Sequence, residues 1–174
     1  MKILLIGPQG SGKSTQGKML SDFLQIPYIS TGDIFRQIAL EDSEMGRRIK
    51  QIIESGQLVD DKVTASLLRE KINSEDCQNG FILDGYPRNL EQATLVDLNF
   101  DKAIYINVPD EAAEERLLKR GRIDDTRESI RKRLALYREK TKPLVEKYKN
   151  KGILIEIGGT GRIEKVQDEI KKSL

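Results

Sequence analysis

The chain has 174 residues, about the size of one ordinary domain with a single core. Its formal net charge is only +2, so no overall field favours nucleic acid or an anionic membrane as a partner. It contains no histidine and only one cysteine, Cys77, which excludes imidazole acid–base chemistry, an internal disulfide and a thiolate metal site.

Short apolar runs alternate with helical patterns along the chain. Strands are predicted at Lys2–Ile6, Phe81–Leu83, Ala103–Val108 and Ile153–Ile157, with a weaker one at Pro27–Ile29. Helices are predicted at Lys13–Leu24, Asp61–Ile72, Asn89–Leu98, Asp110–Arg120, Thr126–Tyr148 and Arg162–Leu174. This alternation indicates an α/β fold, a doubly wound parallel five-stranded sheet with helices on both faces, in one domain spanning residues 1–174.

The first predicted strand runs into a glycine-rich loop. Residues 7–14 read Gly-Pro-Gln-Gly-Ser-Gly-Lys-Ser, a full match to the phosphate-loop pattern G-x-x-x-x-G-K-[ST]. Glycines let backbone N–H groups curl around an anion, and the helix that follows adds its N-terminal partial charge. The motif predicts a nucleotide-phosphate site at Gly10, Ser11, Gly12, Lys13, Ser14 and Thr15, on the fold of the P-loop nucleoside triphosphate hydrolases.

Lys13 can reach the β- and γ-phosphates, and the hydroxyl of Ser14 or Thr15 can approach Mg²⁺. Asp84 closes the apolar run at Phe81–Leu83, at the carboxyl end of a strand, where doubly wound sheets bind ligands. A carboxylate there can orient Mg²⁺ through water, or it can cap the next turn instead. A phosphate loop alone does not name a reaction, because switches, motor ATPases and small-molecule kinases all use it.

Six further stretches resemble adenylate kinases. Three of them are similar to that family's acceptor-site motifs: "STGDIFR" (Ser30–Arg36), "GQLVDD" (Gly56–Asp61) and "GFILDGYPRNLEQA" (Gly80–Ala93). The other three lie within residues 115–134 and are similar to its lid-flanking arginine motifs: "ERLLKR", "GRIDD" and "IRKRL". The resemblance extends from Met1 to about Thr160. It implies a nucleoside monophosphate kinase that transfers the γ-phosphoryl group reversibly from MgATP to AMP, giving two ADP.

The resemblance also implies residue roles. Arg36 and Arg88 would hold the α-phosphate of AMP, and Arg122 and Arg133 would bridge the transferring group, so the catalytic set would be Lys13, Asp84, Arg88, Arg122 and Arg133. The rest of the AMP site would be Thr31, Gln57, Leu58, Val59, Gly85 and Gln92. Arg120 would contact the donor phosphates, and Arg116 and Gly161 the donor adenine. Arginine suits these tasks because it is always charged and can fork around phosphate.

Two alternatives remain open. Thr31 and Gln92 favour AMP, but Asn89 is typical of the pyrimidine nucleoside monophosphate kinases, so a UMP/CMP-type kinase is the first alternative. A P-loop ATPase or switch without an acceptor is the second, although the chain lacks an Asn-Lys-x-Asp guanine-reading element.

The resemblance is weakest in the lid. Residues 30–59, which lack a strand run, are expected to form the helical acceptor insert, but only Gly121 separates Arg120 from Arg122. Residues 120–125 would be a vestigial lid without a zinc site, because no cysteine or histidine is available there. A lid excludes water, so we expect either that this chain hydrolyses ATP more readily than longer-lidded relatives or that another surface covers the site.

The remaining expectations concern partners and location. The predicted ligands are ATP, AMP and ADP with Mg²⁺, and neither nucleic acid nor a membrane is an expected partner. No apolar segment at the N-terminus has the length of a signal peptide or a membrane span, so we expect a cytoplasmic protein, as a monomer.

Overall fold

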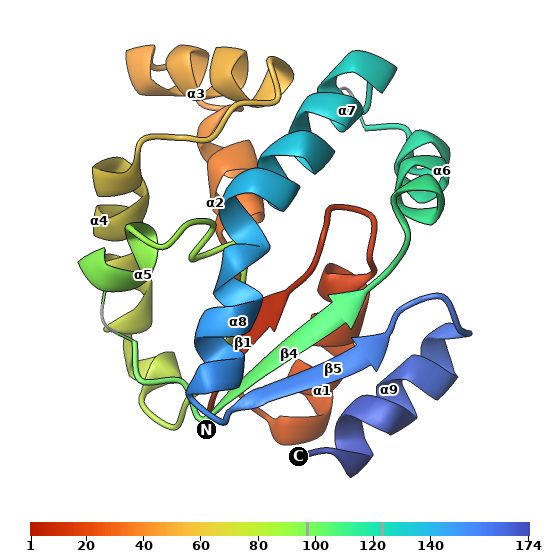
Figure 1. Ribbon diagram of the computed structural model, residues 1–174. Helices are drawn as coiled ribbons and strands as arrows, with labels where there is room; N and C mark the ends of the chain where they lie inside the picture. The colour runs from red at the N-terminus through yellow and green to blue at the C-terminus, as the bar shows by residue number, and fades with distance from the viewer. Residues whose placement is uncertain (97, 123) are drawn as a thin grey trace.

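A parallel five-stranded sheet forms the centre of the computed structural model, which describes residues 1–96, 98–122 and 124–174 (Figure 1). The strands are β1 (Lys2–Ile6), β2 (Tyr28–Ser30), β3 (Phe81–Asp84), β4 (Lys102–Asn107) and β5 (Leu154–Gly158). Their order is β2-β3-β1-β4-β5, and every ladder is parallel. The predicted fold class is confirmed, and all five expected strands are present, including β2, for which the sequence pattern at Pro27–Ile29 was weaker.

Helices surround the sheet. They are α1 (Lys13–Leu24), α2 (Thr31–Ile38), α3 (Glu44–Glu54), α4 (Asp61–Ile72), α5 (Gln92–Leu95), α6 (Asp110–Arg120), α7 (Arg127–Leu136), α8 (Pro143–Asn150) and α9 (Ile163–Lys172), with a 3₁₀ turn η1 (Glu75–Cys77) and a π-helical segment η2 (Tyr137–Thr141). The predictions for α1, α4 and α6 agree with these bounds.

The two sides of the sheet carry separate cores. Leu4 and Ile6 of β1 pack with residues of α4 and α8, whereas Ile3 and Leu5 pack with residues of α1 and α9 (Figure 1). A strand buried on both faces needs an unbroken apolar run, which explains why β1 reads Ile-Leu-Leu-Ile and does not alternate with polar residues.

The helix expected at Asn89–Leu98 is wrong in extent, because α5 covers only Gln92–Leu95. The side-chain Oδ1 of Asn89 accepts a hydrogen bond from the backbone N–H of Gln92 at 2.6 Å, as an N-cap residue does at the start of a helix. At the other end Val96 is extended, with φ −122° and ψ 95°. Asp97, within the expected range, lies outside the described residues.

The long helix expected at Thr126–Tyr148 is divided by η2. Pro143 has no N–H to donate four residues back, and the chain forms a wide turn in which Lys142 N donates to Tyr137 O at 2.8 Å. The altered turn brings Thr141 to the loop after β3, where its Oγ1 donates to Arg88 O at 2.7 Å. The interruption therefore supports the backbone of a predicted site residue.

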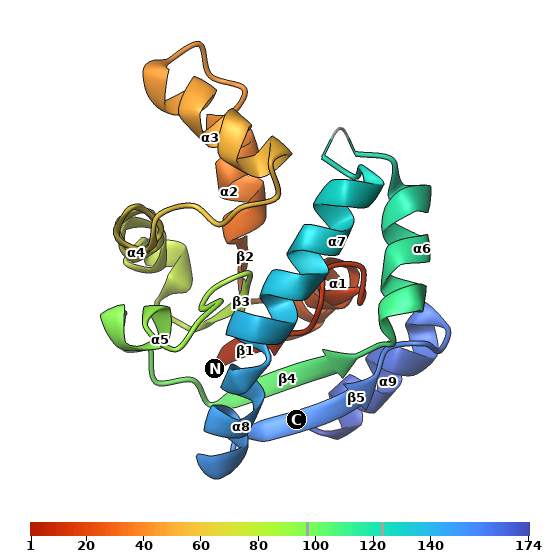
Figure 2. The same ribbon diagram turned by 45° about the horizontal axis from the view of Figure 1, so that its top comes forward.

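The region expected to be a helical insert contains α2 and α3, and its first residue, Ser30, is the last residue of β2. Phe35, Ile49 and Val59 form a small core of its own. Figure 2 shows this insert, with α2 and α3, and the α6–α7 pair as two separate parts that extend upward from the sheet in that view. In the part of the chain that the structure describes, no helix has both the length and the apolar character of a membrane span.

Candidate functional site

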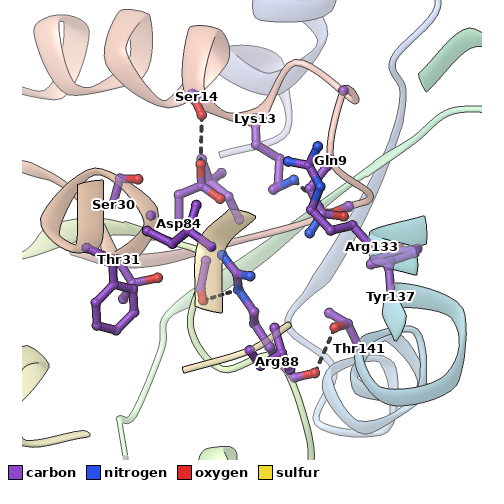
Figure 3. A pocket seen from close by; sticks show the side chains of 18 of the residues that line it. Gln9, Lys13, Ser14, Ser30, Thr31, Asp84, Arg88, Arg133, Tyr137 and Thr141 are labelled. Atoms are coloured by element: carbon purple, nitrogen blue, oxygen red, sulfur yellow. Dashed lines mark hydrogen bonds between the residues drawn. The ribbon is translucent and has the colours of Figure 1, made fainter. Parts of the chain in front are cut away.

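A cavity of about 400 Å³ opens beyond the carboxyl ends of β1 and β3. β1 is the central strand, and the chain leaves β1 and β3 through loops that meet at this edge, which is where open α/β sheets bind ligands. Figure 3 shows Lys13, Gln9 and Arg133 on one side of the cavity, Ser30 and Thr31 on the other, and Asp84 and Arg88 between them.

The loop at residues 7–12 is open in shape. Gly12 precedes α1 with a φ of 95°, a backbone conformation in which a side chain would be strained. A Cβ added to Gly12 would meet nothing within 4 Å, so the space beside the loop is empty. Gly12, Lys13, Ser14 and Thr15 all line the cavity, which places the N-terminus of α1 against it. Such a terminus attracts anions.

The ammonium group of Lys13 is held by this loop. Its Nζ donates to Gly7 O at 2.7 Å and to Pro8 O at 2.8 Å. Burial lowers the pKa of Lys13, and the nearby carboxylate of Asp84 offsets part of that effect. The lysine thus presents a positive charge to the cavity from a position fixed by two backbone carbonyls.

Asp84 lies at the end of β3, facing the phosphate loop. Its Oδ2 accepts hydrogen bonds from Ser14 Oγ at 3.0 Å and from Tyr28 OH at 2.7 Å. Burial and the neighbouring Asp84 raise the pKa of Tyr28, so this tyrosine remains a donor. The role of Tyr28 was not predicted, because nothing in the sequence places β2 beside the loop.

The Ser14–Asp84 pair fits a Mg²⁺ ion. A hydroxyl and a carboxylate oxygen lie 3.0 Å apart beside the phosphate loop, and Mg²⁺ prefers such oxygen ligands while keeping several waters. Among the described residues, no group of three or more His, Cys, Asp or Glu side chains could cage a metal ion. The donor set therefore suits an ion that arrives with a nucleotide.

The acceptor side of the cavity is formed by α2 and the loop after β3. Thr31 is buried, and its Oγ1 has no hydrogen-bond partner within the described part of the chain. A Cβ on Gly85 would lie only 2.5 Å from that oxygen, so the close approach of the two segments requires glycine. Arg88 Nε donates to Gly85 O at 2.9 Å, and Arg36 forms an ion pair with Asp33.

Two aspartates hold the arginines of α6 and α7. Asp125 accepts from Arg120 Nε and Nη2 and from Arg133 Nη2, each at 2.8 Å, and its side chain is fully buried. Asp124 Oδ2 accepts from Arg133 Nη1 at 3.0 Å. Burial alone would raise the pKa of Asp125, but its bonds to the two guanidinium groups outweigh burial and lower it.

These aspartates were missed as functional residues. The sequence offers one signal for them, the two acids that directly follow Gly121-Arg122 in a region otherwise rich in arginine. Arginines clustered around a cavity repel one another unless a carboxylate lies between them.

The structure brings nearly all predicted site residues to this one cavity. Those that line it are Gly10, Gly12, Lys13, Ser14, Thr15, Thr31, Arg36, Gln57, Leu58, Val59, Asp84, Gly85, Arg88, Gln92, Arg116, Arg120, Arg122 and Arg133. Ser11 does not, because it is buried beneath the loop, and Gly161 does not, because it is exposed between β5 and α9. Ile123 of the expected lid lies outside the described residues.

Some lining residues were not predicted. Gln9 of the phosphate loop, Tyr137 of η2 and Thr141 line the cavity beside Arg88 and Arg133. Asn89, the residue that suggested a pyrimidine acceptor, is not part of the lining.

A phosphate loop at the central strand, a hydroxyl–carboxylate pair beside it and arginines around one cavity define a P-loop protein of the nucleotide kinase class. The sequence model of the family described as adenylate kinase matches residues 5–153. The chain belongs to the adenylate kinase family.

Curated relatives extend over the whole chain. It is 41% identical to the adenylate kinase of Corynebacterium urealyticum, over 97% of this chain and 96% of the relative. It is 39% identical to the adenylate kinase of Nocardia farcinica, over 100% and 99%, and 40% identical to that of Leptospira biflexa, over 99% of both chains.

Proposed function

We propose that this chain catalyses the reversible transfer of the γ-phosphoryl group from MgATP to AMP, giving two ADP. The observation that carries this proposal is the layout of the cavity: a phosphate loop with Lys13 on one side, and Thr31 with Arg36 and Arg88 on the other. A hydrolase needs only the first half, whereas a kinase needs both. Family membership and the relatives' names point to the same reaction.

On the donor side, the backbone N–H groups at residues 10–15 would bind the β- and γ-phosphates together with Lys13. Arg120 would contact the same phosphates. Arg116, whose Nη1 lies 3.4 Å from Gly10 O, would lie against the donor adenine. Gly161 would also meet the adenine, although it is not part of the described cavity lining.

On the acceptor side, Arg36 and Arg88 would bind the α-phosphate of AMP. The remaining acceptor contacts would come from Thr31, Gln57, Leu58, Val59, Gly85 and Gln92. The buried, unpartnered Oγ1 of Thr31 supports this assignment, because a buried hydroxyl without a partner costs free energy that a ligand can recover.

Between the two nucleotides, Arg122 and Arg133 would stabilise the charge on the migrating phosphoryl group. Transfer needs in-line positioning and cationic stabilisation and no protein nucleophile. Mg²⁺, held by Ser14 or Thr15 and through water by Asp84, would neutralise charge on the β- and γ-phosphates. Closure of the insert at residues 30–59 would bring the acceptor oxygen into line.

We propose that the site is complete within one chain and that neither nucleic acid nor a membrane is a partner. We propose a monomer that acts on free ATP, AMP and ADP in the cytoplasm, in nucleotide biosynthesis.

A comparison of acceptors tests the proposed function. The purified protein is incubated with MgATP and AMP, CMP, UMP, GMP or no acceptor, and the nucleotides are separated by chromatography. We expect fast ADP formation with AMP only, and a measurable loss of ATP without an acceptor, because the expected lid at residues 120–125 is so short. Faster transfer to CMP or UMP would contradict AMP as the acceptor. Equal ATP loss in every lane would contradict transfer altogether.

A further inference from the structure

The side chain of Gln92 lies between a donor and an acceptor that belong to other parts of the chain. Its Nε2 donates to Asp61 Oδ1 at 2.7 Å, and its Oε1 accepts from the backbone N–H of Arg88 at 2.7 Å. Gln92 is 2% exposed and still contributes to the lining of the cavity. The amide is thus held on both ends at the wall of the acceptor site.

These two bonds determine which end of the Gln92 side-chain amide carries the oxygen and which carries the nitrogen. A carboxylate can only accept, and a backbone N–H can only donate. Rotating the amide by half a turn would point Gln92 Oε1 at the carboxylate of Asp61 and Nε2–H at the N–H of Arg88. Both contacts would then be repulsive, so one orientation of the amide is strongly favoured.

Asp61 is itself held in place. Its Oδ2 accepts from Asn89 Nδ2 at 3.0 Å, and Asn89 Oδ1 accepts from Gln92 N at 2.6 Å. Asn89 therefore holds Asp61 in place and caps the start of α5. It is not part of the cavity lining. The hydroxyl of Tyr86 donates to Gln92 O at 2.7 Å and fixes the backbone as well.

We propose that Asp61 is a positioning residue that sets base specificity by holding the amide of Gln92 in one orientation. The proposal rests on the proposed function, since it concerns the acceptor of that same site. The held amide keeps one lone pair on Oε1 and one N–H on Nε2 for a ligand.

That pair complements a base edge with an amino donor beside a ring-nitrogen acceptor. Adenine and cytosine present this edge, whereas guanine and uracil present a carbonyl acceptor beside an N–H donor. With the phosphate end held by Arg36 and Arg88, a keto base would meet like groups at Gln92, which a polar site rejects strongly. Asp61 thus separates amino bases from keto bases, and it does not separate adenine from cytosine.

The test is the Asp61→Asn variant, because an asparagine amide can accept or donate, so that only the backbone N–H of Arg88 still favours the observed orientation of Gln92. The measured quantities are kcat and KM with AMP, CMP, GMP and UMP. We expect the ratio of kcat/KM for AMP to that for GMP, and for AMP to that for UMP, to fall by about tenfold. The AMP-to-CMP ratio should change little, and kcat at saturating AMP should stay within a few-fold of the unmutated protein.

Asp60→Asn is the matched control. Asp60 precedes α4, and its Oδ1 accepts from Lys62 N and Val63 N without touching Gln92. Asparagine caps a helix as well as aspartate, so this variant removes a neighbouring charge and should leave all four ratios unchanged. Asp61→Ser is a second test variant, since its hydroxyl also donates or accepts, and it should shift the same two ratios in the same direction.

The possible results separate this inference from the proposed function. Two results would overturn the role of Asp61: unchanged ratios in Asp61→Asn and Asp61→Ser, or an equal loss of kcat/KM with all four acceptors. Neither result would contradict the proposed AMP kinase activity of the unmutated protein. No transfer to AMP by the unmutated protein would instead overturn the proposed function, and this is seen before any variant is made.

Discussion

Lys13→Ala should lower kcat for transfer from MgATP to AMP by about a thousandfold or more, with the fold intact. The ammonium group lies at the phosphate loop, at the start of α1, where it donates to Gly7 O and Pro8 O. Fixed charges in such a site stabilise charge that develops during phosphoryl transfer, and removing one costs roughly two to five orders of magnitude in rate.

Lys165→Ala is a suitable control for Lys13→Ala. Lys165 is exposed on α9, and replacing it removes the same charge from the chain without reaching the cavity. The control should keep its full activity, and both variants should show the circular dichroism spectrum of the unmutated protein. Near-normal activity of a folded Lys13→Ala variant would refute the proposed mechanism.

Asp125→Ala should lower both stability and turnover. It removes a fully buried carboxylate from between Arg120 and Arg133, which leaves two guanidinium groups close together without their shared partner. Breaking a buried ion pair in this way costs about 3 kcal/mol in the free energy of unfolding. We also expect kcat to fall more than tenfold, because Arg120 would lose the carboxylate that orients it and Arg133 would keep only its bonds to Asp124.

The stability effect of Asp125 should depend on pH in a definite direction. The pKa of Asp125 is lowered in the folded protein, so its contribution is fully present above the pKa of an unfolded aspartate, about 4. It is lost as the pH falls through the lower pKa of the folded state. The free energy of unfolding, measured with urea, should therefore show the full difference between the unmutated protein and Asp125→Ala at pH 7. This difference should shrink below about pH 4.

Glu128→Ala provides the comparison for Asp125→Ala. Glu128 pairs with Lys132 on the surface of α7 at 3.0 Å, with 80% of its side chain exposed, and such pairs contribute less than about 1 kcal/mol. Equal loss of stability in Glu128→Ala and Asp125→Ala would contradict the importance assigned to the buried network.

Features that are local in the sequence could be predicted from it. The phosphate-loop motif is eight consecutive residues that run from the end of β1 into the first turn of α1, and its glycines indicate the backbone geometry directly. β1, β3 and β4 were readable because both faces of the sheet are buried there, so each of these strands carries an unbroken apolar run. The arginines of the site followed from the family resemblance of short motifs.

The partners of those residues could not be predicted, because the contacts join distant parts of the chain. Tyr28 and Asp84 are 56 residues apart in sequence, and Gln92 and Asp61 are 31 apart. Asn89 shows the risk of reasoning from one residue type, because it suggested a pyrimidine acceptor although its side chain is bound to Asp61.

The helix ends were misjudged where the backbone conformation or a missing N–H overrides the apolar pattern. Val96 is extended and ends α5, and Pro143 accompanies the π turn at Tyr137–Thr141.

The reaction of MgADP alone is the most direct test of AMP kinase activity. The protein is incubated with ADP and Mg²⁺, without added ATP or AMP, and the products are followed by chromatography. Reversible transfer between two bound nucleotides predicts that ATP and AMP appear together in equal amounts until equilibrium. An ATPase or a switch cannot make ATP from ADP, so failure to form ATP, or release of inorganic phosphate in its place, would contradict the proposed function.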